Sequence, residues 1–363
     1  MFLVRAAVMR RGQIVVDEVD DPRPGDDEAL VATVACGICG SDLHALTHGD
    51  QMVEMQRRTG GGVSRMDLDR DLVMGHEFCA EVLEFGPGEQ GRAKVGDLVV
   101  SLPVLVSGGR LRPIGYSNDI GGGYAEQMLL SSSLLLPVPN GLAAEHAALT
   151  EPMAVGRHAV EASQVTSDDA ALVVGCGPVG LAVIAALKQK GLGPVVAADF
   201  APGRRELAEA LGADEVIDPA VTSPYQRWQD LARSASTEGR EPLMRMGGSS
   251  TNPGVIFECV GVPGVLDQVM AGAMRHTQIV VVGVCMEADV VYPMMGITKE
   301  LNLQFVLGYT PAEFADTLRG LAEGELPSEQ LITGHVDLDG VAGAFADLAE
   351  PGRHAKIMVE PGR

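Results

Sequence analysis

The chain has 363 residues, of which 46% are hydrophobic and 45 are glycine, and its 27 basic and 49 acidic residues give a net charge of −22 at pH 7. This length exceeds one ordinary hydrophobic core and predicts two domains, and the composition is that of a packed α/β protein, which excludes a disordered chain. The acidic balance, without any basic cluster, argues against a nucleic acid or an anionic membrane as a partner.

The first half of the chain is predicted to be rich in β-strands. Short, mostly apolar runs alternate there with turn sequences that contain glycine, proline and aspartate. The predicted strands are Ala6–Met9, Gln13–Val19, Ala29–Ala35, one opened by Gly75-His-Glu-Phe78, one around Val95–Val100, and Met128–Leu130. Leu142–Ala162 then reads as helical, with an interruption near Pro152.

The segment Ala170–Asp199 carries the strongest local pattern. It reads as a buried strand over Ala171–Val174, a glycine turn, a helix over roughly Val179–Lys190 and a second strand that ends at Asp199. The turn has the spacing Gly-x-Gly-x-x-Gly, formed by Gly175, Gly177 and Gly180.

Each glycine of this turn has a physical reason. The first permits a tight turn, the second lets the backbone approach a pyrophosphate, and the third lets the helix pack closely on its strand. The helix N-terminus offers free N–H groups to phosphates, and Asp199 lies where a carboxylate accepts hydrogen bonds from a ribose 2′-OH. The pattern predicts a nicotinamide dinucleotide site; an ordinary glycine-rich turn is the alternative.

Strands and helices alternate after Asp199, which predicts a parallel, doubly wound sheet. The predicted strands are Glu215–Ile217, Gly254–Glu258, Gln278–Val282, one from Leu303, and Lys356–Val359; the predicted helices are Pro202–Leu211, Val265–Met274, Pro311–Glu323 and Leu338–Leu348. Ser234–Asn252 is polar and rich in glycine and serine, and is expected to be a surface loop.

Three residues in separate parts of the chain are competent zinc ligands: Cys39, His76 and Glu151. Each taken singly could be a buried cysteine, a core histidine or a helix-capping glutamate. Their neighbours occur in one fixed order: Gly-Ile-Cys39-Gly-Ser-Asp-Leu-His44, Gly-His76-Glu-Phe, Val-Gly-Asp97, Glu151-Pro-Met-Ala-Val-Gly156 and the glycine turn. This order, over nearly the whole chain, closely resembles the zinc-containing medium-chain dehydrogenase/reductase family, which includes the alcohol and polyol dehydrogenases.

The resemblance implies an α/β fold with two parts. A β-rich, GroES-like catalytic domain would be discontinuous, formed by residues 1–153 and 306–363. A doubly wound Rossmann domain that binds the coenzyme would span residues 154–305. It also implies a homo-oligomer, a dimer or tetramer.

The resemblance implies the metal ligands as well. Cys39 and His76 match the first two ligands of one catalytic zinc, and Glu151 matches the third. Glu77 matches a second carboxylate that reaches the metal when substrate is absent. Asp42 matches a residue that orients the histidine ligand.

Proton transfer and coenzyme contacts follow from the same resemblance. Ser41 and His44 match a proton relay, with the hydroxyl beside the substrate oxygen. Val179 and Val155 would flank the nicotinamide, and Gly283 and Val284 follow the strand that binds its carboxamide. The residues implied to contact the cofactor are Gly175, Gly177, Pro178, Val179, Gly180, Asp199, Arg204, Val284 and Lys356.

The choice between NAD and NADP is expected to favour NAD, because a carboxylate at Asp199 would repel a 2′-phosphate. Arg204 and Arg205 lie nearby in the sequence, and their positive charges favour NADP instead. Arg204 and Lys356 also keep the alternative interpretation of solvated surface cations.

The chain departs from the family pattern in two places. Many members carry a four-cysteine structural zinc lobe, but Ser101–Gly121 has no cysteine, so no structural zinc is expected. The interval from His44 to His76 looks longer than usual. It is interpreted either as a flexible flap whose methionines face an apolar substrate or as a solvated surface loop. These methionines are Met52, Met55, Met66 and Met74.

The remaining cysteines are interpreted as core packing. They are scattered, which argues against a disulfide framework and favours the reducing cytoplasm: Cys36, Cys79, Cys176, Cys259 and Cys285. No run is long and apolar enough to span a bilayer.

These observations predict a zinc- and NAD-dependent alcohol dehydrogenase that acts on a primary or secondary alcohol or a polyol, with the aldehyde or ketone as its other substrate. A zinc-free reductase of enones or quinones on the same fold is one alternative. A catalytically idle NAD-binding protein is the other.

Overall fold

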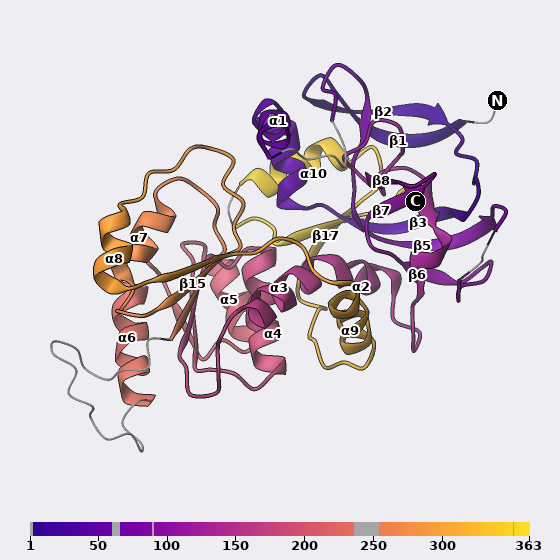
Figure 1. Ribbon diagram of the computed structural model, residues 1–363. Helices are drawn as coiled ribbons and strands as arrows, with labels where there is room; N and C mark the ends of the chain where they lie inside the picture. Colours follow the sequence, from indigo (N-terminus) through magenta and orange to yellow (C-terminus); the bar gives the residue numbers. More distant parts are fainter. Residues whose placement is uncertain (1–2, 60–65, 89–90, 236–253, 351) are drawn as a thin grey trace. The chain divides into compact units, whose positions relative to one another are not determined.

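The computed structural model describes residues 3–59, 66–88, 91–235, 254–350 and 352–363. The chain divides into two compact units, one formed by Met1–Pro152 with Phe314–Arg363 and the other by Met153–Glu313. The expected domain limits, 153/154 and 305/306, lie one and eight residues from these boundaries. The labels used below are those of Figure 1.

The first unit is built on three β-sheets. A three-stranded sheet has the order β2-β1-β4, a larger sheet has the path β10-β6-β5-β3-β18-β17 with β9 paired to β3, and β7 pairs with β8. The strands are β1 (Leu3–Arg10), β2 (Gln13–Asp20), β3 (Glu28–Gly37), β4 (Leu72–Val73), β5 (Glu77–Phe85), β6 (Leu98–Val100), β7 (Val104–Ser107), β8 (Arg110–Pro113), β9 (Gln127–Ser131), β10 (Leu136–Pro137), β17 (Ile332–Val336) and β18 (Lys356–Val359).

The hairpin of β1 and β2 shows how local sequence sets strand pairing here. Arg10 pairs with Gln13, so two residues make the turn, and both Arg11 and Gly12 have positive φ (51° and 72°). Such a turn matches the right-handed twist of the two strands. Strand β18, from the C-terminal segment, pairs antiparallel with β3, and this pairing joins the two stretches of the discontinuous unit.

The prediction of a polar loop or flap after His44 was wrong. The structure has a helix, α1 (Gly40–Arg58), in which only three residues are buried: Asp42, Ala45 and Gly49. Because so few residues of this helix are buried, its sequence has only a weak apolar periodicity, and the helix was not predicted. Met66 and Met74 are buried in the core of the first unit, so they do not line a flap; residues 60–65 lie outside the described residues.

The first unit also contains α2 (Ala144–Ala148), α10 (Val341–Ala349) and a short 3-10 turn η1 (Ser132–Leu134). Helices α3 (Thr150–Ala162) and α9 (Pro311–Ala322) each run across a boundary between the two units in the chain. The break between α2 and α3 falls at Leu149. Pro152 lies in the first turn of α3, where its missing N–H has no partner to lose.

The second unit is a six-stranded parallel sheet in the order β13-β12-β11-β14-β15-β16. The order reverses between β11 and β14, which is the doubly wound arrangement, so the predicted fold class is confirmed. Its strands are β11 (Ala171–Val174), β12 (Val195–Ala198), β13 (Glu215–Ile217), β14 (Val255–Glu258), β15 (Gln278–Val281) and β16 (Asn302–Phe305). Its helices are α4 (Pro178–Gln189), α5 (Pro202–Ala210), α6 (Pro224–Ala235), α7 (Val265–Gly272) and α8 (Pro293–Lys299).

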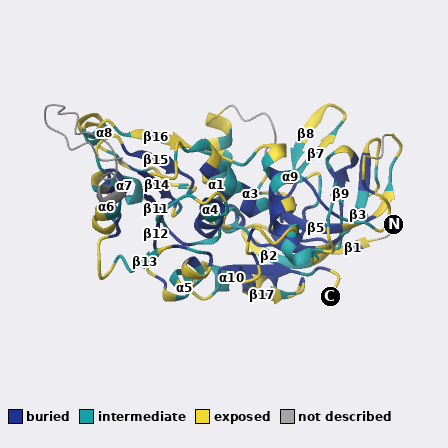
Figure 2. Ribbon diagram, turned by 90° about the horizontal axis from the view of Figure 1, so that it is seen from below, coloured by how far each residue is buried: buried dark blue, intermediate teal, exposed yellow. Residues whose placement is uncertain are grey.

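Burial follows these central strands, and Figure 2 shows buried residues along β11, β12, β14 and β15. Trp228 of α6 is fully buried against the sheet, and its indole N–H donates to the carbonyl of Ala170 at 2.8 Å. The loop expected over Ser234–Asn252 lies, from residue 236 on, outside the described residues. No described helix is both long and apolar enough to cross a membrane.

Candidate functional site

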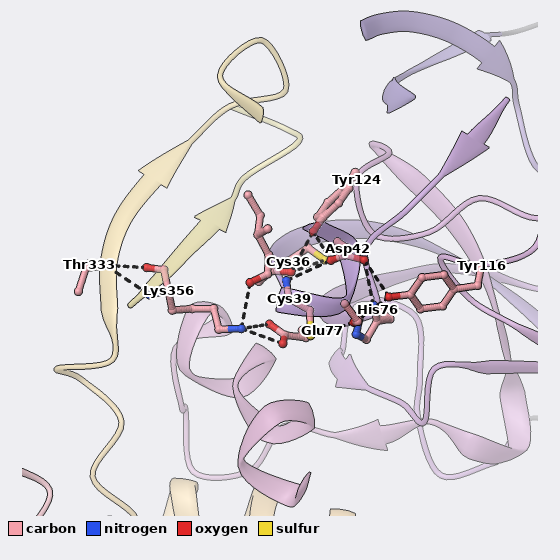
Figure 3. Close-up of polar contacts among 12 residues, drawn as sticks. Cys36, Cys39, Asp42, His76, Glu77, Tyr116, Tyr124, Thr333 and Lys356 are labelled. Carbon is pink, nitrogen blue, oxygen red and sulfur yellow. Dashed lines mark hydrogen bonds and ion pairs between the residues drawn. The ribbon is translucent and has the colours of Figure 1, made fainter. Parts of the chain in front are cut away.

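Three side chains of ligand type meet in the first unit. The ligand atoms of Cys39, His76 and Glu77 all lie within 4.8 Å of one another (Figure 3). Cys39 is the residue that caps the start of α1, and His76 and Glu77 stand at the start of β5. Thiolate, imidazole and carboxylate are the ligands that zinc takes in proteins, so the donor set fits that metal.

Glu151 is not a member of this group of three. It is half-buried in the first turn of α3, and its charge acts on the nearby ammonium of Lys356. The structure thus brings three of the four expected metal ligands together, and the fourth, Glu151, is close enough to Lys356 for its charge to act on that ammonium.

Asp42 is the fully buried centre of the polar network beside these ligands. Its carboxylate accepts the backbone N–H of Cys39 at 3.1 Å and the hydroxyl of Tyr124 at 2.7 Å. Oδ1 of Asp42 also faces Nδ1 of His76 at 3.4 Å. Burial by itself raises the pKa of Asp42, but His76 and these donors outweigh it, so the pKa lies below its usual value.

His76 is buried between two acidic groups. Burial alone lowers the pKa of His76, but the charges of Asp42 and Cys39 outweigh burial and raise it well above its usual value. Its Nδ1 has no hydrogen bond of good geometry and lies 3.4 Å from Oδ1 of Asp42. A carboxylate behind one ring nitrogen is the common arrangement of a metal-binding histidine, whose other nitrogen then faces the ion.

Glu77 forms a buried ion pair that the sequence did not indicate. Nζ of Lys356 lies 2.8 and 2.6 Å from the two carboxylate oxygens of Glu77 and donates to the carbonyl of Ile38 at 3.1 Å. Burial lowers the pKa of Lys356, but the negative charges around it, Glu77 first, raise it above its usual value. Gly37 stands opposite Glu77 in the β3–β5 ladder, where a Cβ would lie 2.2 Å from Oε2 of Glu77, so only glycine leaves room for this pair.

Ser41 lies directly beside the ligands. Its Oγ is 3.1 Å from Sγ of Cys39 and 2.8 Å from the hydroxyl of Tyr116. His44 is one turn further along α1 and half-buried. Burial, and then the charge of His48, lower the pKa of His44.

Sequence reasoning missed Tyr116 and Tyr124. The hydroxyl of Tyr116 lies 3.2 Å from Oδ1 of Asp42, and Tyr124 is fully buried. The available signal was the run of three glycines before Tyr124. A Cβ at Gly123 would lie 2.6 Å from Sγ of Cys36, so the run allows the close packing that brings this tyrosine to the site.

The glycine turn follows β11 in the second unit, at the point where the strand order reverses. Gly175 has φ +92°, which glycine adopts without strain. A Cβ at Gly180 would lie 1.9 Å from the carbonyl oxygen of Gly175, whereas a Cβ at Gly177 would meet nothing within 4 Å. The third glycine therefore brings α4 against the turn, and the second faces open space at the N-terminus of α4.

Asp199 holds the same turn from the end of β12. Its carboxylate accepts the backbone N–H of Cys176 at 2.8 Å and that of Ala201 at 2.8 Å. Arg204 lies 3.9 Å from Asp199, and its Nε is buried without a hydrogen-bond partner. Arg205 instead donates to the carbonyls of Asp199 and Phe200.

The remaining predicted cofactor residues of this unit lie near the carboxyl ends of the strands. Pro178 and Val179 open α4 and are partly exposed, as is Val155. Val284 follows β15 and is 49% exposed. Glu258, at the end of β14, was not predicted; it is buried and accepts the N–H groups of Val260 and Gly261.

Of the cysteines expected to pack in the core, Cys36, Cys79 and Cys176 are buried, whereas Cys259 and Cys285 are only partly so. Burial raises the pKa of Cys79 and of Cys176 to about 12. The thiol of Cys285 donates to the carbonyl of Glu287 at 3.5 Å, so this residue does not belong to the core.

Two family descriptions match the chain: the alcohol dehydrogenase GroES-like domain over residues 25–140 and the zinc-binding dehydrogenase over residues 178–323. The (R,R)-butanediol dehydrogenase of Bacillus subtilis is 30% identical over 357 residues, which cover 96% of each chain. The crystal structure of 2R,3R-butanediol dehydrogenase from Bacillus subtilis is similar with a TM-score of 0.79 and 29% identity over 99% of each chain. A Sinorhizobium meliloti structure assigned as a zinc-binding dehydrogenase, bound to NADP, has a TM-score of 0.79 and 25% identity over 99% of this chain and 100% of that one.

Proposed function

Because the chain belongs to the zinc-type medium-chain alcohol dehydrogenase family, we propose that it interconverts an alcohol and its carbonyl compound with zinc and a nicotinamide cofactor. The grouping of the ligand atoms of Cys39, His76 and Glu77 within 4.8 Å of one another carries this proposal. We further propose a secondary alcohol or a vicinal diol as the substrate class, because the relative with 30% identity is a butanediol dehydrogenase.

The proposed zinc ligands are Cys39, His76 and one carboxylate at a time, from Glu77 or Glu151. Zinc held by this set supplies Lewis-acid chemistry, which lowers the pKa of a bound water from 15.7 to about 7. Two carboxylates with the thiolate would give the site a formal charge of −1 and weaken that effect. The ion pair of Glu77 with Lys356 supports an exchange, because the ammonium balances Glu77 whenever Glu151 is the ligand.

Proton transfer is proposed for Ser41 and His44. Ser41 Oγ lies 3.1 Å from Sγ of Cys39, so a substrate oxygen at the metal would be near this hydroxyl. The contact with Tyr116 at 2.8 Å orients the serine. His44, whose pKa is lowered, is neutral at pH 7 and can take the proton toward solvent.

The cofactor is proposed to bind at the glycine turn. The open space before Gly177 admits a pyrophosphate, and the N–H groups at the start of α4 face it. The unpartnered Nε of Arg204 supports a contact with the ribose or a phosphate. Pro178, Val179 and Val284 are proposed to line the same site. We propose NAD rather than NADP, because the carboxylate of Asp199 repels a 2′-phosphate.

Lys356, which the resemblance implied as a cofactor contact, is instead buried, and its ammonium donates to both carboxylate oxygens of Glu77 and to the carbonyl of Ile38. One catalytic zinc is proposed, without a cysteine-held structural zinc. The segment Ser101–Gly121 forms the hairpin of β7 and β8 and has no cysteine.

A homo-oligomer is proposed on the edge of the parallel sheet. Among the described strands, β16 pairs only with β15, so its other edge offers unpaired N–H and C=O groups. Phe305 at the end of β16 is 65% exposed, and Leu307 is 89% exposed. An open edge with exposed apolar side chains fits pairing with the same edge of a second copy.

A panel of primary, secondary and vicinal-diol alcohols, assayed by NADH absorbance with enzyme of measured zinc content, tests the proposed function. We expect oxidation of secondary alcohols or diols by enzyme that holds zinc, and loss of activity when zinc is removed. Activity on enones without zinc would favour the zinc-free reductase. No turnover on any alcohol or carbonyl compound, with zinc bound, would favour the idle binding protein.

A further inference from the structure

A second group of metal-ligating side chains lies on the first unit, apart from the site described above. The ligand atoms of Glu145, His335 and Glu360 all lie within 4.8 Å of one another. They come from three elements: α2, β17 and the residue after β18; α2 and β17 are labelled in Figure 1. His146, the next residue of α2, is not one of these three, but its imidazole lies beside Glu145.

The imidazoles of His335 and His146 both face the carboxylate of Glu145. Nε2 of His335 lies 3.6 Å from Oε2 of Glu145, and Nε2 of His146 lies 3.6 Å from Oε1 of Glu145. Both distances are too long for a hydrogen bond. The carboxylate of Glu145 therefore stands between two ring nitrogens without being hydrogen-bonded to either of them.

The other nitrogen of each ring has a partner of its own. Nδ1 of His335 lies 2.8 Å from Oε1 of Glu360, and Nδ1 of His146 lies 3.4 Å from Oγ of Ser328. Metal-binding histidines regularly have their second nitrogen held by a carboxylate or another polar group, which fixes the ring and the tautomer. Here the Nδ1 contacts leave each Nε2 atom facing one oxygen of Glu145: His146 faces Oε1 and His335 faces Oε2.

The distance from each imidazole to its nearer oxygen of Glu145 is close to the spacing of neighbouring ligands around one ion. Two ligand atoms that are each about 2.1 Å from a tetrahedral zinc ion lie roughly 3.4 Å apart. The two N···O distances of 3.6 Å are close to this value. We propose that Glu145, His146 and His335 bind a divalent transition-metal ion of the zinc, nickel or copper class, with solvent completing its coordination.

Glu360 orients this site and does not have to be a ligand. Its Oε1 is used by His335, and its Oε2 lies 3.1 Å from a guanidinium nitrogen of Arg363. Two neutral imidazoles and one carboxylate remain, a set that suits zinc, copper or nickel better than calcium or magnesium, which prefer oxygen ligands. An ion there would join α2 to β17, two elements distant in the sequence within the same unit.

Enzyme with its catalytic zinc in place is titrated with Ni²⁺ by calorimetry, and Cu²⁺-loaded enzyme is examined by electron paramagnetic resonance. We expect one ion beyond the catalytic zinc, a copper spectrum with imidazole nitrogens, and a rise in Tm with Ni²⁺. H335Q and H146Q should each weaken Ni²⁺ binding at least about tenfold, the step expected when a metal site loses an interaction. Alcohol oxidation should be unchanged in both.

The matched control is H276Q. His276 forms a single surface pair with Glu300 at 3.3 Å, without a second imidazole, so its removal should leave Ni²⁺ affinity unchanged. Should a histidine variant fail to fold by circular dichroism, E145Q takes its place. The proposal is overturned if no second ion binds, or if H276Q weakens binding as much as H335Q does. Because these readouts are binding, spectra and Tm, that failure would leave the proposed alcohol oxidation standing.

Discussion

Lys356 and Glu77 are joined by a buried ion pair: the ammonium contacts both carboxylate oxygens at 2.8 and 2.6 Å, and both side chains are at most 2% exposed. One residue comes from the last strand, β18, and the other from β5, beside the proposed metal ligands. The pair thus connects the C-terminal segment of the first unit to the acidic centre of its site.

We predict that breaking this pair costs more stability than any surface pair. Lys356→Met leaves the carboxylate of Glu77 buried and unpaired, which should lower the free energy of unfolding by about 3–5 kcal/mol. Adding Glu77→Gln should recover part of the loss, because no uncompensated charge then remains. Urea unfolding measures both variants.

The control for that prediction is Arg5→Met. Arg5 pairs with Asp339 at 3.0 Å, but the two side chains are 44% and 67% exposed, so its loss should cost at most about 1 kcal/mol. Equal losses in Lys356→Met and Arg5→Met would contradict the central role of the buried pair.

Mutation of a metal ligand and mutation of the proton relay should have different effects on zinc content and activity. His76→Ala removes a proposed ligand, so bound zinc and alcohol oxidation should be lost together. Ser41→Ala removes only a proton carrier, so zinc content should be kept while kcat falls by about 10²-fold, the lower end of general acid–base effects. Metal analysis and NADH absorbance on the same preparations test both. A Ser41→Ala enzyme with unchanged kcat would rule out the proposed relay.

The pH dependence should report on His44. Burial and the charge of His48 lower the pKa of His44 from 6.5. His44 therefore remains a neutral proton acceptor at a lower pH than an ordinary histidine does. The acidic limb of kcat/KM for alcohol oxidation should therefore lie below pH 6.5. His48→Gln removes the neighbouring positive charge, raises the pKa of His44 and should move this limb to higher pH. No movement of the limb would mean that His44 does not carry the proton.

Two glycines of the dinucleotide turn provide a matched pair. Alanine at Gly180 would place its Cβ 1.9 Å from the carbonyl oxygen of Gly175, so the helix must shift and stability should fall by about 1–3 kcal/mol. Alanine at Gly177 meets nothing within 4 Å, so Tm should change little while NADH affinity falls at least about tenfold, because the methyl group occupies the cofactor's space. Thermal unfolding and NADH fluorescence titration separate the two effects. Unchanged NADH affinity in Gly177→Ala would place the pyrophosphate elsewhere.

Local patterns predicted the parallel sheet well. Ala171–Val174 and Glu215–Ile217 are strands with the bounds expected, and the alternation of strands and helices was confirmed as a doubly wound order. A central strand such as Ala171–Val174 is apolar along its whole length because both faces of the sheet are covered, so its sequence is unambiguous. The polar helix α1 was missed for the opposite reason: nearly all its side chains are exposed or half-buried, and the sequence therefore shows no clear helical period.

Residue types and their order along the chain were sufficient to identify the family and to select Cys39 and His76 as candidates, because a thiol and an imidazole in that order are chemically distinctive. Which carboxylate stands beside them, and that Tyr116 and Lys356 lie around the site, depended on pairings between strands and loops far apart in the sequence. Only the folded chain decides such contacts, since strand register and the space left by residues such as Gly37 determine which buried charges can meet.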